Sequence, residues 1–426
     1  MTMNRKRVVI VGMGFAGINA AKGLAGSGLE VVLLDRNNYH LFQPLLYQVA
    51  TAGLEQESIA YPVRALVRDW YNLSFQMGEV TSLDLNARVV QTSRGALSYD
   101  YLILAGGSVT NYFGNQGVAR HAYDLKGLAD AERLRNTILN IFELAAQESD
   151  PARRRELLTF VVVGGGPTGV EFAGALTELI RFVFHKDYPT LRLEESRVVL
   201  LEAAPHLLGA MPDRLRRYAQ QRLQQMGVEV CCNTLVADAT ADEVCLGNGE
   251  RIAARTLFWA AGVKAAPLAA LVPGQKGAGG RVLVNQDLSL PEHSEVLVIG
   301  DMAYVEQHGK PLPMIAPVAM QQGRYAARSI IQKERGEEVT PFQYLDKGTM
   351  ATIGRSSAVA RAFGISFSGF GAWLVWLALH LYYLIGFRNR IVVLLNWVWY
   401  YWFHERQVRL ITTNGTGVPG GGTEHG

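Results

Sequence analysis

Two glycine-rich turns carry the residue pattern that most directly indicates chemistry in this chain. The first is Gly12-Met-Gly-Phe-Ala-Gly17, with Asp35 placed 18 residues after its last glycine. In a dinucleotide-binding βαβ unit, such glycines permit a tight turn, close approach of a pyrophosphate, and close packing of helix on strand. The helix N-terminus stabilises the phosphate charge, and the acid accepts hydrogen bonds from ribose hydroxyls. The alternative is a glycine-rich turn without a ligand. The predicted contacts of the first dinucleotide are Gly12, Gly14, Phe15, Ala16, Gly17, Asp35 and Arg36.

The second turn, Gly164-Gly-Gly-Pro-Thr-Gly169, repeats the pattern 152 residues later. Its acid, Glu202, follows after 33 residues instead of about 20, because residues 181–196 form an insertion. An acid at this place favours a free 2′-hydroxyl, so we expect FAD in one unit and NADH, not NADPH, in the other. The predicted contacts of the second dinucleotide are Gly164, Gly166, Pro167, Thr168, Gly169 and Glu202.

Three further apolar runs end in small or acidic residues and are expected to be buried parallel strands that meet a ligand. They lead to Gly106, Gly262 and Asp301. Asp301, at the carboxyl end of a strand, is expected to bind a cofactor hydroxyl, although it could also cap a helix.

These motifs require an α/β protein, and the composition agrees with one. Hydrophobic residues make up 49% and charged residues 19% of 426, which excludes global disorder. A net charge of +3 argues against a nucleic-acid binder. The three cysteines, Cys231, Cys232 and Cys245, can make neither a disulfide framework nor a zinc site, so we expect no metal and reduced thiols. The apolar run after Arg5 to Arg7 is interpreted as a strand, not an export signal.

The C-terminal part of the chain concentrates aromatic residues. Five of the seven tryptophans lie within residues 373–402, in two apolar runs, 372–385 and 391–403, separated by 386–390. Each run is too short to cross a bilayer, and Trp, Tyr and Arg suit the headgroup interface. We therefore predict two interfacial helices and contact with a membrane surface through 372–403. The alternatives are a span over 362–387, or a soluble core or dimer interface.

Together these segments resemble the type II NADH:quinone oxidoreductases, of the two-dinucleotide-binding flavoprotein superfamily. The resemblance runs from Arg7 to about Thr412 and rests on the two turns, on 35–47, 297–301, 316–323 and 344–354, and on the aromatic C-terminal stretch. It implies two Rossmann-like domains, with the NADH domain inserted in the FAD domain, and a C-terminal membrane-associating helical segment. The expected divisions are FAD-binding 1–120 and 281–343, NADH-binding 121–280, membrane-anchoring 344–411, and a disordered tail 412–426.

The resemblance also implies roles for single residues. Glu171 is expected near the nicotinamide and flavin as a proton relay, with helix capping as the alternative. Lys347 is expected to stabilise the anionic reduced flavin, with a surface lysine as the alternative. Gln321 matches the second glutamine of the family's quinone pattern, Pro317 replaces the first, and Ala319 lies between them beside the cofactor.

The implied activity is hydride transfer from NADH to non-covalent FAD and then two electrons to a quinone, without proton pumping. Disulfide, coenzyme A disulfide and sulfide:quinone reductases use cysteines near the flavin, whereas no cysteine precedes Cys231 here. We expect a homodimer on the cytoplasmic face of the inner membrane. The alternatives are a soluble NADH oxidase, a ferredoxin or rubredoxin reductase, and a flavin-binding redox sensor.

Overall fold

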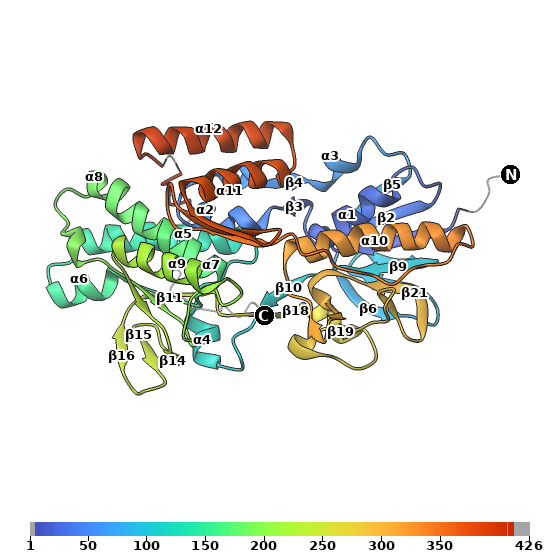
Figure 1. Cartoon of the computed structure of the whole chain (residues 1–426), viewed down its shortest axis with the longest axis horizontal. Coiled ribbons are helices and arrows are strands. Elements are labelled where there is room, and N and C mark those ends of the chain that lie inside the picture. Colours follow the sequence, from blue (N-terminus) through green and yellow to red (C-terminus); the bar gives the residue numbers. More distant parts are fainter. Residues whose placement is uncertain (1–4, 407, 413–426) are drawn as a thin grey trace. The chain divides into compact units, whose positions relative to one another are not determined.

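The computed structural model describes residues 5–406 and 408–412, and the chain divides into two compact units (Figure 1). The first comprises Met1–Leu41, Ala60–Val109 and Val263–Asp346. The second comprises Phe42–Ile59, Thr110–Gly262 and Lys347–Gly426. The predicted disordered tail lies outside the described residues, apart from Thr412.

The first unit is built on a six-stranded sheet, parallel except at one edge. The neighbouring strands run in the order β20-β21-β9-β1-β2-β5, and only the β20–β21 pair is antiparallel. The central strands are continuous apolar runs because both faces of the sheet are covered. The strands are β1 (Arg7–Val11), β2 (Glu30–Asp35), β5 (Leu73–Met77), β9 (Tyr101–Leu104), β20 (Ser289–Leu290) and β21 (His293–Val298).

Helices α1 (Phe15–Leu24) and α10 (Ala316–Glu334) pack together beside this sheet. They approach closely because Gly323 has no side chain: a Cβ there would lie 2.2 Å from the carbonyl oxygen of Ala16. Smaller elements complete the unit: α3 (Val63–Val67), β3 (Tyr39–Leu41), β4 (Ala60–Pro62), β6 (Val80–Asp84), β7 (Val89–Thr92), β8 (Gly95–Ser98), β18 (Val263–Ala265), β19 (Val282–Leu283), β22 (Ala303–Tyr304), β23 (Glu306–Gln307) and β24 (Lys310–Pro311).

The second unit contains a four-stranded parallel sheet in the order β13-β12-β11-β17. Every residue of β11 is buried, as expected for a central parallel strand. Strands of this sheet are β11 (Thr159–Val163), β12 (Arg197–Leu201), β13 (Val228–Cys231) and β17 (Thr256–Trp259), and β14 (Val236–Ala239), β15 (Glu243–Leu246) and β16 (Arg251–Ala253) form an antiparallel sheet. The helices are α2 (Leu46–Ala50), α4 (Gln116–His121), α5 (Leu128–Gln147), α6 (Pro151–Leu157), α7 (Pro167–Glu178), α8 (His185–Asp187) and α9 (Asp213–Gln225), with a π-helical turn at Leu179–Phe184. Strand β10 (Ser108–Thr110) lies at the boundary between the two units in the chain.

A three-stranded antiparallel sheet and two aromatic helices end the second unit. The elements are β25 (Thr349–Thr352), β26 (Ala358–Ala362), β27 (Ile365–Gly369), α11 (Phe370–Tyr383) and α12 (Phe387–Phe403). The two helices are antiparallel, because Trp373 stacks on Tyr401 at 5.6 Å between ring centroids while Trp376 meets Trp397 at 5.7 Å.

Helix α12 begins earlier than the sequence indicated. The expected separator 386–390 shrinks to its glycine, and Arg388 and Arg390 lie in the first turn of the helix. The chain reverses over residues 384–386, with Gly386 at φ +93°, and arginine is a good helix former, so the helix starts directly after the glycine. In the part of the chain that the structure describes, no helix has both the length and the apolar character to cross a membrane.

Candidate functional site

The first glycine-rich turn joins β1 to α1, and its three glycines differ in their surroundings. Gly12 has φ +98°, and a Cβ there would lie 2.3 Å from the carbonyl oxygen of Ala105. A Cβ on Gly17 would lie 1.8 Å from the carbonyl oxygen of Gly12. By contrast, a Cβ on Gly14, which caps α1, would meet nothing within 4 Å. Two glycines therefore serve the packing of the turn, and the third leaves backbone open at a helix N-terminus.

Two acids lie beside this turn at the carboxyl ends of strands. Asp35, the last residue of β2, accepts hydrogen bonds from the backbone N–H of Met13 at 2.6 Å and of Asn37 at 2.8 Å. Burial raises the pKa of Asp35, and these hydrogen bonds partly oppose the rise. Asp301 follows β21 and accepts a hydrogen bond from the Ser108 hydroxyl at 2.6 Å. It occupies a short 3₁₀ turn and does not cap a long helix.

The other predicted residues of the first unit have these positions. Phe15 begins α1, Ala16 is buried behind it, and Arg36 is exposed after β2. The backbone N–H of Gly106 points to the sulfur of Met302 at 3.0 Å. Ala319 is buried near the start of α10, where its Cβ lies close to Gly300.

The side chain of Gln321 is already paired. Its amide donates to the carbonyl of Leu345 at 2.9 Å and accepts from the N–H of Leu345 at 3.0 Å, as a neighbouring strand would. Gln322, the next residue, is buried and accepts a hydrogen bond from the N–H of Gly300 at 2.6 Å. The side chains of both glutamines therefore bind backbone groups. The backbone that Gln321 binds, at Leu345, lies two residues before Lys347 in the chain.

The second glycine-rich turn reproduces the first in detail. Gly164 has φ +110°, a Cβ on Gly169 would lie 1.9 Å from the Gly164 carbonyl oxygen, and a Cβ on Gly166 would meet nothing within 4 Å. Helix α7 starts on Pro167 and Thr168, where a proline needs no hydrogen-bond partner. Glu202 accepts hydrogen bonds from the N–H of Gly165 at 2.5 Å and of Ala204 at 2.7 Å, the counterpart of Asp35.

Two predicted residues of this unit lie outside the turn in the sequence, although the backbone of Ala260, two residues before Gly262, lies against Gly164. Gly262 accepts a hydrogen bond from the N–H of Asn111 at 3.0 Å, and a Cβ there would lie 2.8 Å from the ring of Phe113. Lys347 is exposed, and Gly348 after it has φ +99°.

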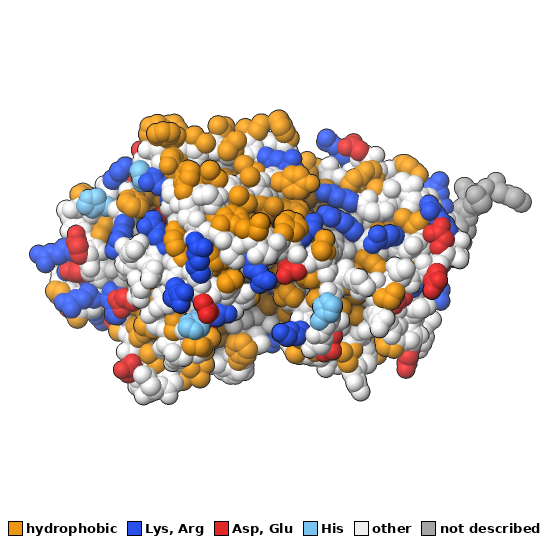
Figure 2. Space-filling view, viewed as in Figure 1, with side chains coloured by type: hydrophobic (Ala, Val, Ile, Leu, Met, Phe, Trp, Pro, Cys, Tyr) orange, Lys and Arg blue, Asp and Glu red, His pale blue; other side chains and the backbone are white. Residues whose placement is uncertain are grey.

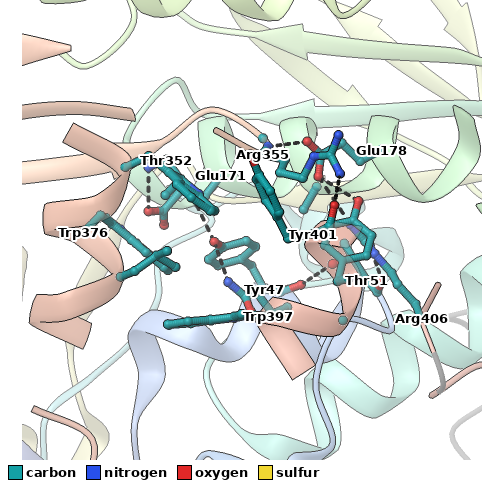
Figure 3. A pocket seen from close by; sticks show the side chains of 17 residues that line it. Tyr47, Thr51, Glu171, Glu178, Thr352, Arg355, Trp376, Trp397, Tyr401 and Arg406 are labelled. Atoms are coloured by element: carbon teal, nitrogen blue, oxygen red, sulfur yellow. Dashed lines mark hydrogen bonds and ion pairs between the residues drawn. The ribbon is translucent and has the colours of Figure 1, made fainter. Parts of the chain in front are cut away.

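A cavity of about 70 Å³ lies within the second unit, between α2, α7, the end of β25 and the two aromatic helices (Figure 3). Aromatic side chains form much of its wall, and two carboxylates and two guanidinium groups line it as well. The lining residues are Tyr47, Gln48, Thr51, Gly53, Glu171, Ala175, Glu178, Thr352, Gly354, Arg355, Trp373, Trp376, Leu377, Trp397, Tyr400, Tyr401 and Arg406.

Glu171 projects from the second turn of α7 into this cavity. Burial raises its pKa to about 8, and hydrogen bonds from the Thr352 backbone N–H and the Trp376 indole partly oppose the rise. The Thr352 N–H lies 3.2 Å from Oε1. At neutral pH this side chain is therefore mainly a carboxylic acid, which can give a proton to an oxygen placed in the cavity.

The hydroxyls next to Glu171 form a short chain. The hydroxyl of Tyr47 lies 3.1 Å from that of Thr352 and accepts a hydrogen bond from the Gln48 amide at 3.0 Å. The indole N–H of Trp397 donates to Gln48 at 2.8 Å, so the aromatic wall is fixed to α2.

Glu178 holds the other end of the cavity. It forms an ion pair with Arg406 at 3.7 Å, in which both side chains are buried. It also accepts hydrogen bonds from the Tyr400 hydroxyl at 2.9 Å and from the backbone N–H of Arg355. Arg406 in turn donates to the carbonyl of Thr51, at the end of α2.

Of two histidines near these sites, His40 is buried and His380 is partly buried. The Nδ1–H of His40 donates a hydrogen bond to the carbonyl of Met13 at 2.8 Å, and His380 stacks on Trp376 at 3.8 Å between ring centroids. Burial lowers the pKa of each to about 4, so both are neutral at neutral pH.

Of the three predicted catalytic residues, only Glu171 lines the cavity. Tyr47 and Glu178 line it too, and no role was expected of them. Trp376 and Arg406 were expected at the membrane interface, but they are buried and line this cavity. One signal existed for Glu178, because it follows Glu171 by seven residues and so lies on the same face of one helix.

A family model and several known proteins that match this chain indicate the same family. Residues 6–323 match the family model described as pyridine nucleotide-disulphide oxidoreductase. A type II NADH:quinone oxidoreductase of Mycobacterium tuberculosis is 43% identical over 408 residues, 92% of this chain and 87% of that protein. One of Staphylococcus haemolyticus is 32% identical over 387 residues, 87% of this chain and 92% of that protein.

Solved structures give the same fold. NDH2 from Plasmodium falciparum, in complex with NADH, has a TM-score of 0.88 at 18% identity and covers 95% of this chain and 100% of that one. The sulfide:quinone oxidoreductase of Aquifex aeolicus has a TM-score of 0.73 at 19% identity, with 91% and 92% covered. These likenesses confirm the predicted α/β fold with its two dinucleotide-binding units.

Proposed function

The chain belongs to the pyridine nucleotide-disulphide oxidoreductase family and, within it, to the type II NADH:quinone oxidoreductases, and we propose how its residues divide the work of that reaction. As a member it is an FAD-dependent enzyme that oxidises NADH and reduces quinone. The soluble oxidase, the ferredoxin-type reductase and the sensor are therefore set aside. The roles below are assigned from the geometry of each unit.

The residues of the first unit suit FAD. The open backbone at Gly14 caps a helix, where N–H groups face a pyrophosphate, and the carboxylate of Asp35 retains lone pairs for a ribose. When bound, FAD accepts a hydride and passes on two electrons. Asp301 and Gly106 line the same strand ends, and we assign Lys347 to the reduced flavin's negative charge. The sequence contains no flavin-attachment motif, so we assign non-covalent binding to FAD.

The residues of the second unit suit NADH. Gly166 repeats the open helix N-terminus, and Glu202 repeats the ribose acid. A carboxylate at this place repels a 2′-phosphate, so NADH is preferred to NADPH.

We assign quinone reduction to the cavity of the second unit, and the observation that carries this assignment is the buried carboxyl group of Glu171 in an aromatic cleft. Flat apolar rings pack well between Trp and Tyr side chains. A carboxylic acid in the same cleft supplies the proton that a quinone oxygen needs when electrons arrive. We assign Gln321 an indirect role in quinone reduction, because its side chain holds the backbone at Leu345. Its amide could bind a quinone carbonyl only after it released that backbone.

The membrane surface is assigned to α11 and α12. Figure 2 shows hydrophobic side chains gathered over these helices, with basic residues beside them. Arg388 and Arg390 are exposed at the start of α12, which suits anionic headgroups. The most exposed large apolar side chains here are Phe370, Leu374, Tyr382, Phe387, Leu395, Trp402 and Phe403. We further propose a homodimer on the cytoplasmic face of the inner membrane, without proton translocation.

Rapid mixing tests the division of work. Anaerobic NADH should reduce the flavin of wild-type and Glu171→Gln enzyme at similar rates, while reoxidation by a short-chain quinone should be slowed in the variant. Ferricyanide accepts electrons without protons, so it should reoxidise both equally. Equal quinone rates in the two proteins would show that Glu171 is not the proton donor.

A further inference from the structure

Glu178 is a second carboxylate in the cavity that contains Glu171. The two lie seven residues apart on α7, about 10 Å along the helix axis. The residue between them on that face is Ala175, whose side chain is small enough to leave the cavity continuous from one carboxylate to the other. Figure 3 shows the two groups at different ends of the cluster, with Tyr47 and Arg355 near its middle.

The two carboxylates have opposite environments. Glu171 faces backbone and indole N–H groups in an apolar setting, whereas Glu178 pairs with the guanidinium of Arg406 and with the Tyr400 hydroxyl. An acid in an apolar setting close to a second carboxylate in a polar, ion-paired setting is a usual arrangement of a proton donor and its partner. Directly after Glu178 the helix widens into the π-helical turn Leu179–Phe184, a distortion that occurs often at functional sites.

Polar groups for a connecting path are present between them. Tyr47 and Thr352 share a hydrogen bond in which either hydroxyl can donate, so a proton can pass in either direction. Burial raises the pKa of Tyr47 most, and the charges of Glu171 and Glu178 raise it further. The Tyr47 hydroxyl is therefore within electrostatic reach of both carboxylates.

The cavity also has room and a partner for water. A volume of about 70 Å³ exceeds the roughly 10–15 Å³ that one water requires. Arg406 is 5% exposed, and its Nε has no hydrogen-bond partner among the described residues. A buried guanidinium N–H without a protein partner is a place where an ordered water is expected.

We propose that Glu178, with Tyr400 and Arg406, forms the outer station of a proton path that crosses the cavity by water and the Tyr47–Thr352 hydroxyls and reloads Glu171. The inference rests on the proposed function of the cavity. In each turnover Glu171 gives one proton to the acceptor oxygen and becomes a carboxylate. One proton from solvent enters at the Glu178 end, successive hydrogen bonds hand it on, and Glu171 regains its acid form. No residue of the path is oxidised or reduced.

The path is defined by the ionisable groups around it. Helix α2 contributes Tyr47, α7 the two glutamates, and α12 the side chains of Tyr400 and Tyr401. Arg355 follows β25, Arg406 follows α12, and His380 on α11 lies behind Trp376. Glu178 acts through the path and does not touch the acceptor, so it is a positioning residue.

Hydrogen exchange at Glu171 in the resting holoenzyme tests the path without turnover. The infrared band of its protonated carboxyl, assigned by its loss in Glu171→Gln, should shift quickly when the enzyme is mixed into D₂O. Exchange should slow at least tenfold in Glu178→Gln. Because that variant leaves Arg406 buried without its partner, Glu178→Gln with Arg406→Met removes both charges and should show the same slowing in a folded protein.

Kinetics provide the second measurement. In Glu178→Gln, flavin reoxidation by quinone should fall at least tenfold, more steeply as pH rises, while reoxidation by ferricyanide stays within about twofold. The matched control is Glu229→Gln, which breaks the pair between Arg197 and Glu229, at 2.8 Å in the β12–β13 sheet. It should leave both rates and the exchange unchanged.

Two outcomes would overturn the proposal. Unchanged exchange at Glu171 in both variants would exclude a path through Glu178, and an equal loss with quinone and ferricyanide would show a structural role only. If wild-type enzyme reduced no quinone, the proposed function would fail, and the exchange measurement would still decide whether the path exists.

Discussion

At the scale of single residues, burial decides what Glu171 can do. Among the described residues, no guanidinium pairs with this carboxyl as Arg406 pairs with Glu178, so removal from water dominates its protonation. The same helix therefore presents one neutral acid and one ion-paired carboxylate to one cavity.

Quinone reduction should consequently slow as the pH rises. Only the acid form of Glu171 donates, and burial raises its pKa to about 8, so the donor is present below that pH and lost above it. Stopped-flow reoxidation by quinone should fall about tenfold for each pH unit above the midpoint, with ferricyanide rates nearly flat. Glu171→Gln should lower the quinone rate roughly 10²-fold and abolish the inflection. A midpoint unaffected by that substitution would assign it to another group.

The preference for NADH should depend on Glu202. Its carboxylate already accepts two backbone N–H groups, so it is fixed where a 2′-phosphate would be repelled. Glu202→Gln should narrow the ratio of kcat/KM for NADH over NADPH about tenfold, or about 1.4 kcal/mol. Similar kcat/KM values for the two nucleotides in the wild-type enzyme would contradict this role.

What the sequence could predict at this scale follows from locality. Asp35 follows its glycine turn at the usual spacing, Glu202 was expected from the acid that ends the next strand despite an insertion, and Glu171 was expected from the family resemblance. Arg406 and Tyr47 approach Glu178 only through tertiary packing, and no local pattern encodes that encounter. The pairing of Gln321 with Leu345 was hidden for the same reason.

At the scale of elements, the two strand–turn–helix units share one division of labour among their glycines. The first and third glycines are closed by backbone, and the middle one is open. The sequence motif contains this information, because each glycine occupies its position for a separate reason.

A pair of alanine substitutions should distinguish the glycine that leaves room for a ligand from the glycine that the packing of the turn requires. Gly14→Ala adds a methyl group to open space, so the fold should remain stable while FAD affinity falls at least tenfold. Gly17→Ala places a Cβ 1.8 Å from the carbonyl oxygen of Gly12 and should destabilise the unit itself. Thermal unfolding and flavin absorbance distinguish the two effects. The matched control, Gly166→Ala, should weaken NADH binding and keep the flavin; loss of flavin there would contradict the assignment of units.

Membrane binding should depend on the outer face of α12. Phe387 is 78% and Trp402 70% exposed, and full burial of such side chains stabilises by about 1.5–3 kcal/mol each. Replacing both by serine should reduce sedimentation with anionic vesicles at least tenfold and leave thermal stability nearly unchanged. Leu235→Ser, which alters another exposed side chain, should bind as wild type does. Unchanged sedimentation of the double variant would place the membrane contact elsewhere.

Here the sequence located the helices but not their ends. The aromatic runs predicted two helices, yet α12 includes the two arginines that were expected to separate them. The three residues 384–386 sufficed for the reversal, and the charges of the arginines gave no reason for a break.

At the scale of the whole molecule, each of the two units is built from three separate segments of the chain. The sequence predicted two dinucleotide-binding units and an insertion, because each unit opens with a recognisable turn. It gave no sign that residues 42–59 group with the second unit, since their membership depends on packing against α5 and α7.

The purified protein should be yellow and should release its flavin on acid precipitation. The sequence has no residue in a flavin-attachment motif, and the turn at Gly14 offers only hydrogen bonds and dipoles to the cofactor. The supernatant should contain FAD in about a one-to-one ratio to chains, measured by fluorescence after phosphodiesterase treatment. Flavin that stayed in the pellet would indicate a covalent link.

The ion pair of Glu178 with Arg406 joins residues that the ribosome makes at very different times. At roughly 5–20 residues per second, the 228 residues from 179 to 406 take on the order of ten to fifty seconds to synthesise. During that interval α7 can form with the parallel sheet, while its second carboxylate still awaits a countercharge. The nucleotide-binding part of the second unit can thus mature on the nascent chain, whereas its cavity closes only when the final stretch emerges. Slow translation or a stalled ribosome near the end of the message would leave a partly folded chain in which the parallel sheet and α7 are formed but the cavity is not closed.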